Sequence, residues 1–103
     1  MAKESVKKVR TDDDVKKKAV KLVVVHLKKK IENNFPGKEY VLEWIEEMEE
    51  LLSEEQFILS QYHQMRKEFN DAIERTLDYE MRSKLRDSWY SLGKALDKKL
   101  KQN

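Results

Sequence analysis

Side chains that commonly carry out chemistry are few in this chain, and their spacing does not form a catalytic or metal-binding motif. Histidine occurs only as His26 and His63, and neither belongs to a His-x-x-x-His or Glu-x-x-His pair that could ligate a metal on a helix. No serine has the flanking glycines of a nucleophile elbow. Cysteine is absent, which removes thiolate nucleophiles and thiolate zinc ligands. We therefore expect no enzyme activity, and we predict no catalytic, cofactor-binding or metal-ligating residues.

Basic side chains are concentrated near the N-terminus, where residues 1–30 hold eleven Lys or Arg against four Asp or Glu. Clustered lysines attract phosphate backbones through counterion release, so this block is a candidate polyanion-binding surface. It has few arginines and no interleaved aromatic residues of the kind on which bases stack. The candidate polyanion-binding residues are Lys16, Lys17, Lys18, Lys21, Lys28, Lys29 and Lys30.

Acidic side chains dominate the next block, residues 31–60, with nine Asp or Glu against one Lys or Arg. A row of carboxylates on one exposed helix face does not converge on a cation, so we predict no metal site there. The same face suits the docking of a basic partner, or it could be covered by the lysine-rich segment. The predicted partner-docking residues are Glu43, Glu46, Glu47 and Glu50.

Helices must position these charges, because no glycine or proline interrupts residues 38–92 and apolar residues recur there every three or four positions. The pattern predicts an all-α fold, a small antiparallel bundle of three to four helices. A length of 103 residues fits one domain, here residues 11–103. Residues 1–10 are mostly charged and lack periodicity, which indicates a flexible N-terminal arm. The predicted helices span about residues 12–33, 38–52, 54–75 and 78–101.

The first helix has a clear start signal, because Thr11 can cap it and three aspartates follow at the positive end of its dipole. Residues 20–27 are rich in β-branched side chains and would also suit a buried strand. A helix is favoured because no second strand candidate exists to pair with it. The predicted apolar face comprises Val15, Ala19, Leu22, Val23, His26, Leu27 and Ile31.

The asparagines, Pro36 and Gly37 of residues 33–37 predict a turn before the second helix. In that helix Leu42, Ile45, Met48, Leu51 and Leu52 should face inward, with Tyr40 and Trp44 flanking them. Residues 53–56 fit a capping box, in which Ser53 would start the third helix and Gln56 would reach back.

Beyond Ser53 the apolar series runs from Ile58 to Leu100 in steps of three or four, and two interpretations stay open. A turn between Asn70 and Tyr79 would give a four-helix monomer. Without a turn, a single helix about 70 Å long would leave its second half to pair with another chain as a homodimer.

Trp44, followed by an aliphatic residue, leads into an acidic stretch that ends in paired leucines at residues 51 and 52. Residues 85–100 combine Trp89, leucines and basic residues at regular spacing. Residues 40–52 and 85–100 thus resemble the first and third helices of the spectrin repeat, the three-helix unit of spectrin and α-actinin rods. The resemblance implies that both tryptophans pack near one another in the core, and that the protein is an elastic or scaffolding element that binds other proteins.

Three functional interpretations follow. The leading one is a non-enzymatic helical bundle that acts as a protein–protein interaction or scaffolding module, with a protein partner. The first alternative is nucleic-acid binding through the lysine-rich first helix. The second is an engineered or de novo designed bundle, which frequent Glu and Lys and near-absent Gly would suit. No stretch approaches the roughly 18 apolar residues of a membrane span, so we expect a soluble, cytoplasmic protein with no membrane partner.

Overall fold

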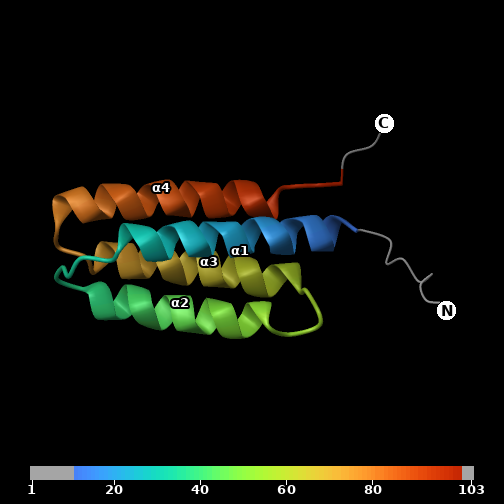
Figure 1. Cartoon of the computed structure of the whole chain (residues 1–103), viewed down its shortest axis with the longest axis horizontal. Coiled ribbons are helices and arrows are strands. Elements are labelled where there is room, and N and C mark those ends of the chain that lie inside the picture. The colour runs from blue at the N-terminus through green and yellow to red at the C-terminus, as the bar shows by residue number, and fades with distance from the viewer. Residues whose placement is uncertain (1–10, 101–103) are drawn as a thin grey trace.

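Four helices that run alternately up and down account for most of residues 11–100, which are the residues that the computed structural model describes (Figure 1). Each helix packs between two others, because α1 contacts both α2 and α4, and α3 contacts the same two helices from the far side. The predicted all-α antiparallel bundle is confirmed, and the predicted arm at residues 1–10 lies outside the described residues. The helices are α1 (Asp12–Lys30), α2 (Lys38–Leu52), α3 (Leu59–Glu74) and α4 (Tyr79–Leu96).

The start of α1 agrees with the sequence. The Thr11 hydroxyl accepts a hydrogen bond from the Asp14 amide at 3.2 Å, and the Asp14 carboxylate accepts one from the Thr11 amide at 3.1 Å. Acidic residues fill the first turn of the helix and lysines fill its last turn, so both ends suit the helix dipole. The helix ends at Lys30, three residues earlier than predicted, because residues 31–37 form the connection to α2.

The buried face of α1 differs from the prediction. Leu22 and His26 were expected to face inward, but both are exposed, and Leu22 keeps 54% of its surface accessible. Val20 and Val24 are buried instead, in a row that continues to Leu27 and Ile31. The valine-rich segment offers two apolar rows of similar strength. Contacts with α4 and α2 select one of them and leave the other in solvent.

The second helix begins after a left-handed residue, Gly37, whose φ is +91°. The predicted turn at residues 33–37 and the helix bounds 38–52 are therefore confirmed. Two side chains of α2 differ from the prediction. Leu42 was expected to face inward but is exposed, and Trp44 was expected at the flank but is buried. The Trp44 ring stacks on Phe69 of α3 with 4.3 Å between ring centroids. Trp44 also donates its indole N–H to the Met65 carbonyl at 2.7 Å.

The predicted capping box at Ser53 is wrong. Ser53 ends α2 rather than starting α3, and its hydroxyl donates to the Glu50 carbonyl at 2.6 Å. Residues 53–58 form a loop, which is held by Phe57 stacking on Tyr62 at 4.4 Å. The third helix therefore begins at Leu59, five residues later than predicted. A local turn stabilised by an aromatic contact replaces the expected cap.

The chain turns between α3 and α4, within the segment in which the sequence allowed a turn. Residues 75–78 are not helical, and Asp78 caps α4 by accepting a hydrogen bond from the Met81 amide at 2.8 Å. Thr76 is fully buried and donates its hydroxyl proton to the Ala72 carbonyl at 3.2 Å. The single long helix on which the homodimer interpretation depended is therefore not formed. The last helix ends at Leu96, before the predicted residue 101.

Tyr62 predicts how stability depends on alkaline pH. Its side chain is fully buried and donates to the Leu51 carbonyl at 3.3 Å. Burial, with a smaller contribution from the nearby Glu54 carboxylate, raises the pKa of Tyr62 above its ordinary value. The folded state then keeps the phenol proton at a pH where the unfolded chain has lost it, so the unfolding free energy falls as pH rises through the tyrosine range.

We expect the free energy of unfolding to decrease above about pH 10, and to decrease less in a Tyr62→Phe variant, which has no phenol to ionise. Urea unfolding of both chains between pH 8 and pH 11 measures the difference. Parallel curves for the two chains would show that Tyr62 does not contribute to the alkaline loss.

Candidate functional site

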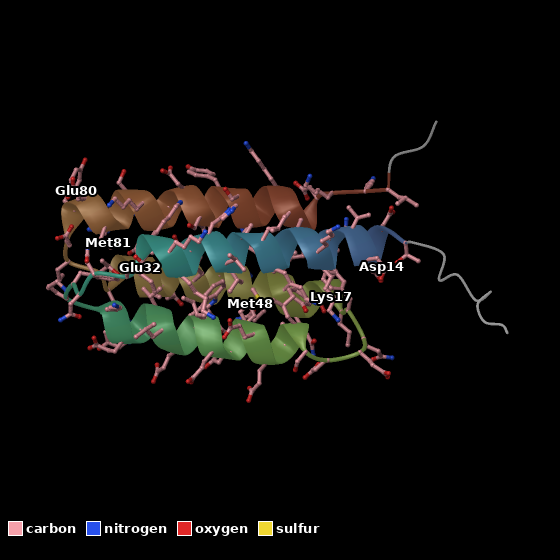
Figure 2. The ribbon with its side chains drawn as sticks, viewed as in Figure 1. Asp14, Lys17, Glu32, Met48, Glu80 and Met81 are labelled. Atoms are coloured by element: carbon pink, nitrogen blue, oxygen red, sulfur yellow. The ribbon has the colours of Figure 1, made fainter. Side chains whose placement is uncertain are left out.

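The seven candidate lysines of α1 do not form one surface, because four of them are engaged within the protein. Lys16 is buried, and its ammonium donates to the Lys98 carbonyl beyond the end of α4. Lys17 extends away from α4 and donates to the carbonyl of Glu54, in the α2–α3 loop, at 2.7 Å (Figure 2). Long lysine stems can cover apolar surface while the charged group finds a polar partner.

The other two engaged lysines lie near the far end of α1. Lys28 forms an ion pair with Glu49 of α2 at 2.6 Å, and Lys30 donates to the Ser88 hydroxyl of α4 at 3.2 Å. These contacts hold α1 to both of its neighbours. Three candidate lysines stay exposed without a hydrogen bond to any residue in the described range 11–100, and they are Lys18, Lys21 and Lys29.

Three acidic side chains of α2, Glu43, Glu47 and Glu50, lie along its boundary with α3. Two adjoining hollows follow this boundary and share Glu47, so together they form one acidic groove. Apolar side chains contribute to both hollows, namely Trp44 and Ala72 in the first, and Leu51 and Met65 in the second. The carboxylates of the acidic groove are those of Glu43, Glu47, Glu50, Glu54, Glu68 and Asp71.

Both helices supply charge of the same sign to this groove. Its only basic lining residue is Arg75, whose guanidinium lies 5.0 Å from the centre of the Tyr40 ring. None of the groove carboxylates forms an ion pair with another residue of the described range. Like charges on facing helices repel, so the acidic groove has a negative potential that a cationic ligand would relieve.

The four predicted docking residues are therefore divided by the fold. Glu43, Glu47 and Glu50 line the acidic groove, whereas Glu46 is exposed and lines neither hollow. The alternative that α1 covers the acidic face holds only for Glu49, which pairs with Lys28 on the other side of α2. The contributions of Glu68 and Asp71 from α3 were not anticipated, because only the fold brings them opposite α2.

A second feature missed by the sequence reasoning joins α3 to α4. The Arg66 guanidinium lies 3.6 Å from the centre of the Trp89 ring and donates to the Trp89 carbonyl at 3.1 Å. The Trp89 indole N–H donates in return to the Arg66 carbonyl at 3.2 Å. Gly93 leaves room for this arrangement, since a Cβ there would lie 2.5 Å from an Arg66 nitrogen. The space beside Gly93 is thus occupied by the Arg66 side chain.

The two tryptophans that carry the spectrin resemblance both bind α3. Trp44 donates to the carbonyl of residue 65 from α2, and Trp89 donates to the next carbonyl, that of residue 66, from α4. Trp44 is buried and Trp89 is half-buried. The third helix is therefore held between two indole rings at the middle of its length.

Within the described residues, no group of three or more His, Asp or Glu side chains is placed to hold a metal ion. None of the helices among these residues has both the length and the apolar character needed to cross a membrane. His63 is exposed. Comparison of the chain with protein-family models, with curated proteins and with solved structures found no match, so the spectrin-repeat resemblance stays a prediction.

Proposed function

We propose that this chain is a non-enzymatic helical-bundle protein that binds a basic segment of a partner protein along the acidic groove. The observation that supports the proposal best is the convergence of six carboxylates from α2, α3 and their connecting loop on one groove. Opposite charges at an interface favour association and fix its orientation. A basic partner would also remove the repulsion between the two helices.

Apolar atoms between the carboxylates define the kind of segment that fits. Leu51 is half-buried, and Met65 and Ala72 line the groove with the small part of their surface that stays accessible. A bound segment can place apolar side chains against these atoms while its cations face the glutamates. A helix that carries lysines beside a leucine stripe meets both requirements. Binding an amphipathic helix in a groove is a recurrent mode of peptide recognition.

A labelled 18-residue peptide with lysine and leucine at helical spacing provides the test, by fluorescence anisotropy at about 50 mM salt. We expect saturable binding, and we expect the double variant Glu43→Lys, Glu47→Lys to weaken it at least about 10-fold, because like charges placed opposite one another oppose association. A peptide with glutamate in place of lysine should not bind.

The double variant Glu39→Lys, Glu46→Lys is the matched control, because it makes the same charge change on exposed positions of α2 outside the groove. Equal weakening by both double variants would mean that only net charge attracts the peptide. That result, or no binding to the unmodified protein, would overturn the proposal.

A further inference from the structure

One face of α4 carries two cationic side chains between two aromatic ones. Tyr79, Arg82, Arg86 and Tyr90 follow one another at steps of three and four residues, so they share one side of the helix. The buried row of α4, which includes Met81, Leu85 and Leu92, lies on the other side. We name the four residues the arginine–tyrosine face.

Three of these four side chains are exposed, and Arg82 is half-buried. Tyr79 keeps 86% of its surface accessible and Tyr90 keeps 60%, values that few large aromatic residues show in a folded domain. Neither arginine forms an ion pair with another residue of the described chain, residues 11–100. Tyr79, Arg82 and Arg86 line one hollow together with Ser83. The Tyr90 ring also packs edge-on against Trp89, with 5.3 Å between ring centroids. The face therefore offers two largely exposed rings and two cations that have no ion pair among the described residues.

The third helix extends this surface with further cationic and polar groups. A neighbouring hollow is lined by His63, Arg66, Lys67, Asn70 and Trp89, with Asp71 as its one acidic residue. The bond between the Arg66 guanidinium and the Trp89 carbonyl fixes α3 against α4 at this place. Both helices thus present the surface on a rigid support, which reduces the entropy lost when a ligand binds.

We propose that the arginine–tyrosine face binds single-stranded nucleic acid. Every base has a flat surface that can stack on a tyrosine, and its phosphates can pair with the arginines between the rings. Tyr79 and Tyr90 are eleven residues apart, about 16 Å along the helix axis, so they serve separate nucleotides. This surface has the arginines and aromatic rings that the lysine block of α1 lacks.

An acidic protein is the less suitable ligand. Protein interfaces bury a contiguous apolar centre, whereas Arg82, Ser83 and Arg86 separate the two exposed rings and leave no such centre. A chain of carboxylates would neutralise the arginines but would leave both aromatic faces without a partner. Alternating planar bases and phosphates match both features.

The test is anisotropy of a labelled 12-nucleotide single strand, as RNA and as DNA, titrated with the full chain at about 50 and 200 mM salt. With three or so phosphate contacts, affinity should fall about 10- to 20-fold between these salt concentrations. Tyr79→Ala and Tyr90→Ala should each weaken binding about 5- to 100-fold through lost stacking. The double variant Arg82→Ala, Arg86→Ala should flatten the salt dependence.

Lys18→Ala with Lys29→Ala is the control pair, because it removes two exposed charges from α1 and should leave the affinity nearly unchanged. Unchanged melting temperatures would show that the exposed substitutions preserve the fold. The proposal is overturned by no binding at 50 mM salt, by equal losses in the control pair, or by tighter binding of duplex than of single strand. Equal binding of a labelled polyglutamate peptide, with the same loss on tyrosine substitution, would identify an acidic protein ligand and also overturn it.

Discussion

A Phe69→Ala variant is expected to lose about 3–5 kcal/mol of unfolding free energy, the largest effect of any substitution considered for this protein. Phe69 has no accessible surface, and its ring stacks on Trp44 with an interplanar angle of 20°. Truncation would remove the ring that joins α2 to α3 and leave a cavity beneath the acidic groove. Less apolar packing between α2 and α3 would then remain to offset the repulsion between the groove carboxylates.

Urea unfolding followed by tryptophan fluorescence and by circular dichroism measures this loss. The control is Leu77→Ala, a truncation in the α3–α4 turn at a side chain that is 78% exposed, and its effect should stay within about 0.5 kcal/mol. A loss below 1 kcal/mol for Phe69→Ala would show that the α2–α3 contact contributes little to stability.

Gly37→Ala should give the second large loss. At φ +91° a side chain strains the backbone by about 1–3 kcal/mol. The added Cβ would also lie 2.8 Å from the Arg75 carbonyl oxygen and 3.2 Å from the Thr76 Cα. These are backbone atoms of the α3–α4 turn, which cannot move aside as a flexible side chain can, so the α1–α2 connection would separate from that turn.

Gly93→Ala is the matched comparison for Gly37. There the three atoms nearest to the added Cβ all belong to the end of the Arg66 side chain, which can shift at the cost of its contact with Trp89, and an alanine favours the helix by roughly 1 kcal/mol. In a domain of this size each kcal/mol changes the melting temperature by about 4–8 °C. Thermal unfolding should therefore place Gly37→Ala well below Gly93→Ala, and equal melting temperatures would contradict the steric argument.

How well the sequence predicted each helix depends on how many apolar rows that helix offers. The third and fourth helices each carry one clear row, with Tyr62, Phe69 and Ile73 in one and Leu85 in the other, and the structure buries these residues. Ile58 and Leu77, which belong to the same apolar series but lie outside the helices, are exposed. The first helix carries competing rows because valines follow one another. Periodicity cannot choose between such rows, since the choice depends on helices far away in the chain.

The candidate surfaces show the same limit. The acidic residues of α2 were evident from composition, but their division between the groove and the α1 side depends on which helix packs on each side. The pairing of Arg66 with Trp89 joins residues 23 positions apart, and no local pattern indicates it. The spacing of Tyr79, Arg82, Arg86 and Tyr90 was readable in advance. It places these four residues on the polar side of α4, opposite the apolar row from which the helix was predicted.

The even number of helices has a mechanical consequence. The chain returns to the end of the bundle at which it started, so α1 begins and α4 finishes side by side (Figure 1). The Leu100 amide donates to the Asp12 carboxylate at 2.7 Å, and Lys16 bonds to Lys98 one turn further in. Tension applied at residues 12 and 100 would break these contacts in sequence and peel α1 from α4. Under tension the contacts between α1 and α4 would therefore break one after another, starting at the loaded end. Unfolding in this geometry needs a lower force than shearing all the contacts along the helices at once.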